Sequence, residues 1–450
     1  MIVFKIYIGQ LRQRRILLEA DPDKAGNAGG ETEQGGAGAG ATFQHVLARF
    51  RPDRGCEQHR LESGTVAIAT LLVSDVAAEK RACCELSHAA RLDPFFRPPD
   101  MMRELTPPGN LGRDKLDGAT PVTTDALTRL TILLETELHA TNRAIVARMD
   151  SPVALIPQLA AHLVASGGKR LRPLLTLAAA KLCGYEGERH VSLAACVEFI
   201  HTATLLHDDV VDESVLRRGS ASANAVFGNK ASVLVGDFLF ARAFQLMVDD
   251  GSLEVLRILS AAAATIAEGE VLQLTTQNDL ETTEQKYFDV IRGKTAALFA
   301  AACEVGGVIA GRSAAECAAL QSFGMELGMA FQLVDDALDY DADQTLLGKT
   351  IGDDFREGKL TYPVLLSIAS AAAEGDEAAF WTRTIGRGEQ TATDLQTALD
   401  FMRKHNATGH SLARADEFVA SACATLEIFP DSPMRQALMD VARYTTARRF

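Results

Sequence analysis

Aromatic residues are scarce in this chain, and so are prolines in its second part. Aromatic side chains make up 6% of the 450 residues, and three of the 14 prolines follow residue 173. Proline interrupts helices and aromatic residues are typical of strands, so a chain with few of either favours helices. The hydrophobic content of 47% is sufficient for one large core, with or without an appended region.

Other absences argue against several classes of protein. No half of the chain is strongly basic and the formal net charge is −14, which argues against nucleic acid as a partner. The eight cysteines are scattered without a Cys-x-x-Cys pair, so we expect no zinc site or disulfide framework, and a reducing, cytoplasmic setting. No apolar run reaches the ~20 residues of a membrane span, so we expect no transmembrane segment.

Residues 1–120 differ from the rest of the chain. Residues 25–41 are a low-complexity tract rich in glycine and alanine, and proline pairs at 98–99 and 107–108 interrupt any long helical spacing. We therefore expect a low-complexity, disordered N-terminal extension over residues 1–120 and a single catalytic domain over 121–450. Met101 and Met102 precede the helical part, and mass spectrometry of the natural N-terminus would show whether residues 1–100 exist in the cell.

From about residue 122, apolar residues recur at helical spacing up to the C-terminus. No stretch alternates for long enough to predict a strand. We therefore expect an all-α fold, a single large bundle of ten or more helices around a central cavity. The clearest predicted helices cover residues 190–214, 222–247, 253–277, 293–310, 313–340 and 360–372.

Two of these helices carry carboxylates where an apolar stripe should continue. Asp208 and Asp212 extend one stripe, and Asp335 and Asp339 extend the other, at the 3.6-residue helical period. Unpaired acids there would repel each other and lose hydration, so both faces must open on a cavity that contains cations. Carboxylates at this spacing suit Mg²⁺, and Mg²⁺ bound by few carboxylates usually carries a phosphate.

Basic residues accompany the acidic segments. Lys169 and Arg172 belong to the segment Gly-Gly-Lys-Arg-Leu-Arg-Pro at a helix start, where a bound anion would satisfy both the cations and the free N–H groups. Arg217 and Arg218 follow the first acidic segment and suit bidentate contacts with phosphate. Taken alone, either group could be an ordinary solvated basic turn.

Three lysines and one histidine complete the candidate site. The two Gly-Lys-Thr segments, with Lys294 and Lys349, lack the first glycine of a P-loop and follow no strand, so a nucleotide site is rejected. With Lys359 they fit neutralisers of phosphate. His201 shares the stripe of Asp208 two turns away, which favours a functional role over a core histidine. A di-iron site is rejected because the only Glu-x-x-His, at 85–88, lies in the N-terminal region.

These motifs occur in the order typical of trans-isoprenyl diphosphate synthases, which the chain resembles over residues 122–450. They are Gly-Gly-Lys-Arg-Leu-Arg-Pro, Asp-Asp-Val-Val-Asp with Arg-Arg-Gly, Gly-Lys-Thr, and Phe-Gln-Leu-Val-Asp-Asp-Ala-Leu-Asp. Residues 198–247 are most similar to the long-chain octaprenyl, solanesyl and decaprenyl diphosphate synthases of quinone side-chain synthesis. The resemblance implies the isoprenoid synthase fold, a homodimer, and a membrane-bound product built from isopentenyl diphosphate and an allylic diphosphate, farnesyl or geranyl.

The resemblance also implies a role for each motif residue. Asp209 and Asp336 point about 100° off the acidic stripes and are expected to order waters or neighbouring groups. Lys294 joins three of the aspartates as catalytic residues. Three Mg²⁺ ions would be held by Asp208, Asp212, Asp335 and Asp339. The allylic diphosphate would be bound by Arg217, Lys294, Thr295, Gln332, Lys349 and Lys359. Isopentenyl diphosphate would be bound by Lys169, Arg172, His201 and Arg218.

Ala203 and Thr204, about one turn before Asp208, are expected to control chain length. Short-chain members of the family typically place an aromatic residue there, so small residues predict a long tunnel and a long product. They do not separate products of eight, nine and ten units. Two alternatives remain: a class I terpene cyclase, which normally lacks the second aspartate-rich helix, and a non-catalytic regulatory subunit, which tends to lose one aspartate motif.

Overall fold

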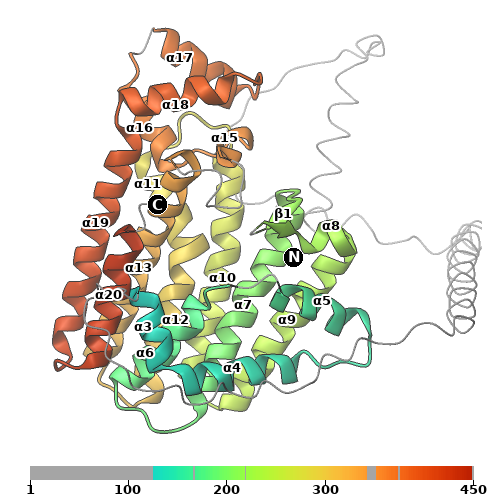
Figure 1. Ribbon diagram of the computed structural model, residues 1–450, viewed down its shortest axis with the longest axis vertical. Coiled ribbons are helices and arrows are strands. Elements are labelled where there is room, and N and C mark those ends of the chain that lie inside the picture. The colour runs from blue at the N-terminus through green and yellow to red at the C-terminus, as the bar shows by residue number, and fades with distance from the viewer. Residues whose placement is uncertain (1–124, 166–167, 218, 342–350, 373–374, 448–450) are drawn as a thin grey trace, which may run out of the picture. The chain divides into compact units, whose positions relative to one another are not determined.

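Helices make up most of the described chain, as the sequence predicts (Figure 1). The computed structural model describes residues 125–165, 168–217, 219–341, 351–372 and 375–447, which all belong to one compact unit. The expected N-terminal extension, residues 1–120, lies outside the described residues. The first helices are α3 (Ala126–Leu133), α4 (Glu135–Arg148), α5 (Leu155–Ala165), α6 (Leu171–Leu182), α7 (Arg189–Val211), α8 (Ala223–Phe227), α9 (Asn229–Asp250) and α10 (Leu253–Thr276).

The second half of the chain adds longer helices and shorter connecting turns. Helices α12 and α13 adjoin each other and pack together, and α13 also packs along α19. These elements are α11 (Glu284–Ile291), the π-helical turn η2 (Arg292–Ala296), α12 (Ala297–Ile309), α13 (Ala314–Asp341), α15 (Asp353–Arg356), α16 (Tyr362–Ser370), α17 (Asp376–Trp381), the π-helical turn η3 (Thr382–Gly386), α18 (Asp394–Lys404), α19 (Ala407–Thr425), the 3₁₀ turn η4 (Leu426–Ile428) and α20 (Pro433–Ala447).

Helix α12 lies at the centre of the bundle because, apart from the half-buried Glu304, its side chains are apolar. Leu298 and Ala301 face a buried cluster shared with α7, α9 and α10, whereas Phe299 and Cys303 face one shared with α6, α13 and α19. A helix that is hydrophobic all round is typical of a core position. Gly324 of α13 allows the close approach to α12, since a Cβ there would lie 2.3 Å from the carbonyl oxygen of Phe299.

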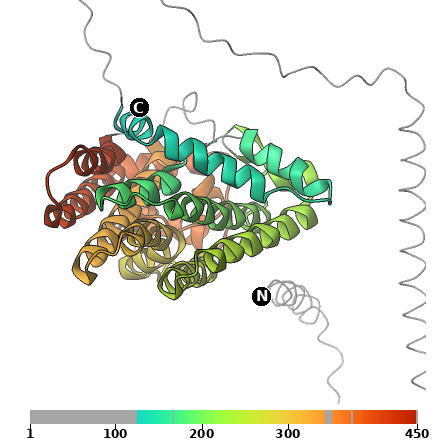
Figure 2. The same cartoon turned by 90° about the horizontal axis from the view of Figure 1, so that it is seen from below.

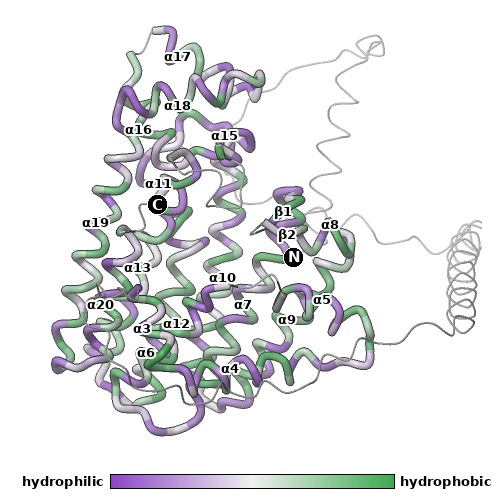
Figure 3. The backbone as a smooth tube through the Cα atoms, viewed as in Figure 1, coloured by the Kyte–Doolittle hydropathy of each residue, from purple (hydrophilic) through white to green (hydrophobic). Residues whose placement is uncertain are grey.

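A third buried cluster covers the end of α13. It joins Tyr340 of α13 to Phe355 of α15, Phe380 and Trp381 of α17, and residues of α16 and α18. The rings of Phe355 and Phe380 are stacked with their centroids 6.4 Å apart. At the opposite end, α4 lies across α6 and α7 (Figures 1 and 2). Apolar and polar stretches alternate along most helices in Figure 3, as expected for helices with one buried side.

The predicted helix limits are close to those observed, with two differences. The helix expected over 222–247 is interrupted at Gly228, whose φ of 84° favours glycine, and so becomes α8 and α9. The helix expected over 293–310 begins with the π-helical turn η2. A short antiparallel pair that the sequence did not predict, β1 (Leu216–Arg217) and β2 (Ser220–Ala221), follows α7. The all-α fold is confirmed.

Helix α9 is notably apolar. Among the helices in the described ranges, it is the one whose length and composition would allow it to cross a membrane. This does not contradict the prediction of no transmembrane segment, because a buried core helix can have the same length and composition. One side of α9 packs on α7 through buried residues such as Val235 and Leu239, as in the core helix of a bundle.

Candidate active site

The first acidic segment lies at the C-terminal end of α7. Burial raises the pKa of Asp208 to about 7, and the carboxylates of Glu270 and Asp212 add to this, whereas Lys294 opposes it. Asp212 caps the helix, and its Oδ2 atom lies 3.4 Å from Nζ of Lys359. Asp208 is therefore a carboxylate whose charge is costly without a further cation, as the stripe predicts.

Asp209 points into the protein, as its offset from the stripe predicts. Its side chain is buried and accepts hydrogen bonds from Nε of Arg217 at 2.7 and 2.9 Å, while Nη2 of Arg217 lies 2.6 Å from Oδ1. Its backbone carbonyl accepts from the side-chain amide of Asn224 at 3.1 Å. Asp209 thus fixes the guanidinium of Arg217 and the short β1–β2 hairpin next to the acidic segment.

The second acidic segment lies near the C-terminal end of α13. Asp335 is exposed, and Asp339 accepts the backbone N–H of Asp354 at 3.1 Å. Asp336 is buried and accepts hydrogen bonds from the hydroxyl of Tyr287 and from the amide of Gln332, each at 2.7 Å. As the helical period predicts, Asp335 lies on the exposed side of α13, whereas Asp336 points into the protein.

One short segment links the two acidic groups. Lys359 lies 3.4 Å from Asp212, at the end of α7, and 3.9 Å from Asp354. Asp354 in turn donates its backbone N–H to Asp339 of α13. The electrostatic partners of Lys359 include Asp354 and Asp212, which raise its pKa despite burial. The ends of α7 and α13 therefore border one site, with a lysine between them.

The π-helical turn η2 brings Lys294 and Thr295 to the same site. Lys294 Nζ lies 3.1 Å from Oε2 of Glu270 on α10, and the hydroxyl of Thr295 donates to Oε1 of Gln332 at 2.8 Å. Burial lowers the pKa of Lys294, but Asp208 and Glu270 raise it by more, so the lysine stays charged. Gly269 permits this approach, because a Cβ there would lie 2.5 Å from the backbone nitrogen of Lys294.

The second cationic group surrounds the start of α6. Nη1 of Arg172 lies 3.1 Å from Nε2 of His201, and its guanidinium covers the ring of Phe299 at 4.5 Å. Arg170, which the sequence did not single out, forms an ion pair with Glu198 of α7. The structure therefore brings together two of the residues expected to bind isopentenyl diphosphate.

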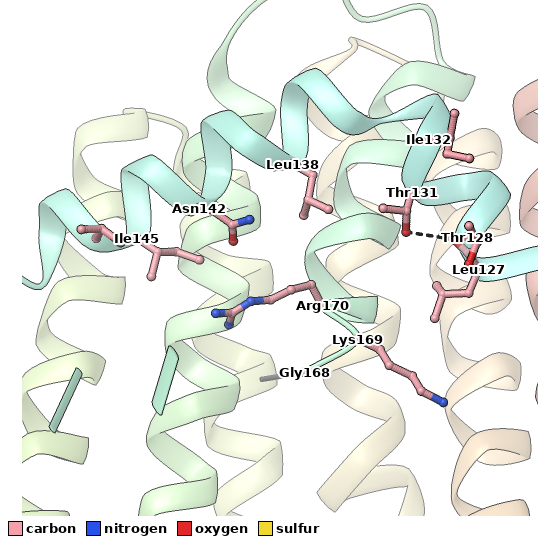
Figure 4. Close-up of a pocket in the computed structure, with 11 residues that line it drawn as sticks. Leu127, Thr128, Thr131, Ile132, Leu138, Asn142, Ile145, Gly168, Lys169 and Arg170 are labelled. Carbon is pink, nitrogen blue, oxygen red and sulfur yellow. Dashed lines mark hydrogen bonds between the residues drawn. The ribbon is translucent and has the colours of Figure 1, made fainter. Parts of the chain in front are cut away.

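Lys169 lies at the edge of a cavity of about 620 Å³. Figure 4 shows this cavity between α3 and α4 on one side and residues 168–170 on the other. Leu138 and Ile145 from α4 line it next to Arg170. The cavity has an apolar wall with cations at one end.

The two residues expected to set chain length lie on different sides of α7. Ala203 is completely buried in the cluster that α7 shares with α9, whereas Thr204 is partly exposed and donates its hydroxyl to the carbonyl of His201 at 2.7 Å. A larger side chain at Ala203 would disturb the core, so Thr204 is the better position for testing the tunnel. The role of both residues in chain length stays a prediction.

Two of the predicted site residues, Arg218 and Lys349, lie outside the described ranges, so their expected roles stay predictions. Three other residues of the site were not identified from the sequence. Glu270, Tyr287 and Asp354 were missed because each acts on a neighbour from a different helix or turn. Of these three, only Glu270 has a signal in the sequence. It follows Gly269, and a glycine in the middle of a long helix is typical of a close helix contact.

The oxygen donors at this site suit magnesium. Among the residues that the structure describes, no group of three or more histidine, cysteine or acidic side chains is placed to enclose a metal by itself. Mg²⁺ characteristically uses one or two carboxylates together with water and substrate phosphates, which agrees with two separate acidic helix ends. Oε1 of Glu270 is buried without a hydrogen-bond partner, a further acceptor near Asp208 and Lys294.

Comparison with known proteins gives a consistent result. The family described as "Polyprenyl synthetase" matches residues 153–402. The chain is 47% identical over 322 residues to the octaprenyl diphosphate synthase of Escherichia coli (strain K12), covering 72% of this chain and 99% of that protein. It is 42% identical over 301 residues to the all-trans-nonaprenyl-diphosphate synthase (geranyl-diphosphate specific) of Rhodobacter capsulatus, covering 67% and 91%.

Solved structures agree with these relatives. A decaprenyl diphosphate synthase from Rhodobacter capsulatus is 53% identical, with a TM-score of 0.69 and coverage of 72% of this chain and 99% of that one. A polyprenyl synthase from Caulobacter crescentus CB15, complexed with calcium and isoprenyl diphosphate, is 51% identical, with a TM-score of 0.70 and coverage of 73% and 100%.

Proposed function

The chain belongs to the polyprenyl synthetase family, and from that premise we propose that it is a long-chain trans-polyprenyl diphosphate synthase. It adds isopentenyl diphosphate units to an allylic diphosphate, farnesyl or geranyl. The observation that supports this most directly is the pair of acidic helix ends bordering one site with Lys359 between them. A product of eight, nine or ten units would serve as a quinone side chain, that of ubiquinone.

Magnesium fits the carboxylates at this site. Asp208 and Asp212 on one side, and Asp335 and Asp339 on the other, would hold the ions, three by resemblance to the family. When bound, Mg²⁺ supplies Lewis-acid stabilisation of the negative charge that develops on the leaving diphosphate. The raised pKa of Asp208, caused by burial and by neighbouring carboxylates, supports a carboxylate that requires a cation partner.

The residues of the chain divide the reaction between two anion sites. Lys294, Lys359 and Arg217, which lie beside the acidic groups, would neutralise the allylic diphosphate, so that the allylic C–O bond ionises. Lys349 completes this group by resemblance. The double bond of isopentenyl diphosphate then attacks the allylic carbon, one C–C bond forms, and a proton leaves to the released diphosphate.

Isopentenyl diphosphate would bind at the other anion site, next to the start of α6. Lys169, Arg172 and His201 hold it there, with Arg218 added by resemblance. Cations at a helix start bind an anion together with the free backbone N–H groups. Water must stay out of the site during ionisation, because it would convert the cation to an alcohol.

Incubation with labelled isopentenyl diphosphate, farnesyl or geranyl diphosphate and Mg²⁺ tests this function. We expect linear products of eight to ten units after dephosphorylation and chromatography. A cyclic hydrocarbon would instead indicate a terpene cyclase. No product unless a second protein is added would indicate a regulatory subunit.

Product length provides a second test, at Thr204. Thr204→Phe would shorten the main product by several units, because an aromatic ring one turn before Asp208 would obstruct the growing chain. Val211→Phe, at an exposed site at the end of the same helix, is the control. Unchanged length in Thr204→Phe would place the tunnel elsewhere.

We also propose a homodimer formed through α9 and α10. Leu234 and Val248 of α9 are 67% and 66% exposed, and Leu253 at the start of α10 is 82% exposed. Positions 234 and 248 are separated by almost four helical turns and share one face, so an apolar strip runs along α9. The same strip accounts for the high hydropathy of this helix.

Sedimentation velocity tests the dimer. Leu234→Glu combined with Val248→Glu should give a monomer, whereas Val146→Glu, at a 61% exposed site on α4, should not. Binding of the wild-type chain to lipid vesicles without self-association would contradict the proposal. The setting we propose is the cytoplasm, supported by five cysteines of the described chain that are all free thiols.

A further inference from the structure

The turn that follows α10 contacts the backbone that carries Lys359. The N–H of Asn278 donates to the carbonyl oxygen of Gly358 at 3.0 Å, and the side-chain amide of Gln277 donates to the carbonyl of Glu357. These carbonyls belong to the two residues that directly precede Lys359. Helix α10 ends on the same side of the bundle as α15 (Figure 1). The first contact joins two backbones, so its geometry depends on the dihedral angles of Asn278.

The contact depends on two residues with left-handed backbones. Asn278 has a φ of 60°, a conformation that asparagine and glycine adopt more readily than other residues. Gly358 is buried and has a φ of 68°. A Cβ added to Gly358 would lie 2.0 Å from Oδ1 of Asn278, so the asparagine side chain packs directly against this glycine. A side chain at position 358, or a β-branched residue at position 278, would therefore disturb the contact.

Lys359 has a fixed place at the end of α15. The N–H of Gly358 donates to the carbonyl of Phe355 at 3.1 Å, and the N–H of Lys359 donates to that of Asp354 at 2.9 Å. This pair of bonds is the Schellman motif, in which a glycine follows the last helical turn. Phe355 is 1% exposed within the third buried cluster, which anchors α15 to the core. The motif thus fixes the backbone of Lys359 relative to α15, and Asn278 fixes it relative to α10.

This backbone position decides which carboxylates Lys359 can meet. Its Nζ atom lies 2.5 Å from Glu357, 3.4 Å from Asp212 and 3.9 Å from Asp354. Of these three, only Asp212 belongs to the end of α7, whereas the other two belong to the lysine's own segment. A lysine side chain is flexible, so a displaced backbone would leave it with its local partners. The reach of Lys359 towards α7 therefore depends on where α10 holds Gly358.

We propose that Asn278 is a positioning residue for the allylic diphosphate site, because its left-handed turn holds Gly358 and so keeps Lys359 within reach of the end of α7. The proposal rests on the proposed function, in which Lys359 neutralises the allylic diphosphate. Helix α10 then places two lysines of this site. Lys294 is held by the side chain of Glu270 at 3.1 Å, and Lys359 is held through the backbone of the turn after the helix.

Substitutions on both sides of the contact give the first test. Asn278→Val should raise KM for the allylic diphosphate about tenfold and change KM for isopentenyl diphosphate less than about twofold, because the latter is expected at the start of α6. Gly358→Ala approaches the contact from the other side and should raise the same KM. Asn278→Gly keeps the left-handed turn and its N–H, so both KM values should stay within about threefold of the wild type.

The matched control is Asn406→Val, at the start of α19. Asn406 also has a left-handed backbone, with a φ of 50°, and a Cβ at Gly409 would lie 2.4 Å from its Oδ1 atom. Both valine variants should therefore have a lowered Tm, but only Asn278→Val should raise KM for the allylic diphosphate. An equal rise in both variants, or no rise in Asn278→Val, would overturn the proposal.

A double-substitution cycle shows whether Asn278 acts through the lysine. The Asn278→Val/Lys359→Met protein should have a KM for the allylic diphosphate within about twofold of Lys359→Met alone. Independent, multiplicative losses would contradict the proposal. A wild-type enzyme without prenyl-transfer activity would refute the proposed function itself, whereas an active wild type with multiplicative losses would refute only this inference.

Calorimetric titration with inorganic diphosphate and Mg²⁺ gives a readout that does not depend on turnover. The Kd of diphosphate should rise about tenfold in Asn278→Val and stay near the wild-type value in Asn278→Gly and Asn406→Val. An unchanged Kd in Asn278→Val would mean that Lys359 is not displaced and would contradict the proposal. An inactive wild type whose diphosphate binding is weakened in this way would refute the proposed function and support the positioning of Lys359.

Discussion

The acidic ends of α7 and α13 share one sequence spacing but have different surroundings. At the end of α7, Asp209 is paired with Arg217 at 2.6 Å and Asp212 with Lys359 at 3.4 Å. At the end of α13, Asp336 accepts hydrogen bonds from the neutral side chains of Tyr287 and Gln332. These contacts are ion pairs in the first group and hydrogen bonds from neutral donors in the second.

This difference has a consequence for charge. Arg217 and Lys359 already offset part of the negative charge near α7, and their partners Asp209 and Asp212 hold them where a diphosphate can reach them. Neutral donors fix the geometry at α13 without adding a positive charge, and burial raises the pKa of Asp336 to about 8. We infer that α13 depends more on added cations, while α7 contributes more of the protein's own phosphate-binding groups.

The largest effect is expected from removing one proposed metal-binding carboxylate from the end of α7 or of α13. Asp208→Asn and Asp335→Asn should each lower kcat about 10³-fold, because both ends must act on one diphosphate. Steady-state kinetics with labelled isopentenyl diphosphate measures this. Asp249→Asn, which removes a surface ion pair with Arg148 at 2.7 Å, is the control. Near-normal activity of Asp335→Asn would mean that only α7 serves catalysis.

The next effect concerns ligand-induced stability. Mg²⁺ with inorganic diphosphate should raise Tm by about 5 °C, since a ligand at a hundred times its Kd stabilises the folded state by about 2.7 kcal/mol. In Asp335→Asn the shift should be largely lost, because α13 depends on added cations. Differential scanning calorimetry gives the result, with Mg²⁺ alone and diphosphate alone as controls. A full shift in Asp335→Asn would remove the difference between the two ends.

A smaller effect is expected in the metal-free protein as pH changes. The pKa of folded Asp208 is raised to about 7 by burial, above its value of 3.8 in the unfolded chain. Asp208 therefore contributes fully to the free energy of unfolding below pH 3.8, where it is protonated, and this contribution is lost as pH rises through 7. Asp208→Asn should therefore be more stable than the wild type by on the order of 2 kcal/mol at pH 8, and not at pH 4.

Urea unfolding with EDTA at both pH values measures this change. Asp335→Asn, at an exposed carboxylate, is the matched control and should show no comparable gain. A gain of equal size in both variants would show that the two ends have the same electrostatic environment. A stability of Asp208→Asn that does not change with pH would contradict the raised pKa.

The smallest effect distinguishes the two buried aspartates. Asp209→Asn should raise KM for the allylic diphosphate about tenfold with kcat changed less than about threefold, because it loosens Arg217, which binds the diphosphate. Asp336→Asn should do the reverse, lowering kcat with KM nearly unchanged. Initial-rate kinetics at saturating isopentenyl diphosphate tests both. The same pattern in both variants would show that the two buried carboxylates have one role.

Much of the fold was predictable from the period of the apolar residues. The helices at α7, α10 and α13 follow from spacing alone, and their limits agree with prediction to within a few residues. The interruption at Gly228 and the π-helical turn η2 were not predicted. The turn η2 depends on a contact with another helix, the approach of Gly269 to the backbone of Lys294, which local sequence does not encode. The interruption at Gly228 depends on a φ of 84°, which the apolar period does not indicate.

The site shows a similar division. The spacing of Asp208 and Asp212, and of Asp335 and Asp339, identified both acidic faces because a helix has a fixed period. The offset of about 100° indicated that Asp209 and Asp336 point elsewhere. It did not reveal their partners, Arg217 and Tyr287, because the one is eight residues away and the other belongs to another helix.

By itself, the sequence determined the helical class, the two acidic faces and the motifs of the family, since each is a local pattern with a fixed period or order. The tertiary structure decided which carboxylates meet cations, which are held by neutral donors, and which way the hydroxyl of Thr295 points. These properties depend on groups from α10, α11 and η2 that converge only when the bundle packs. Burial then makes each such contact directional, because an unpaired buried polar group is costly.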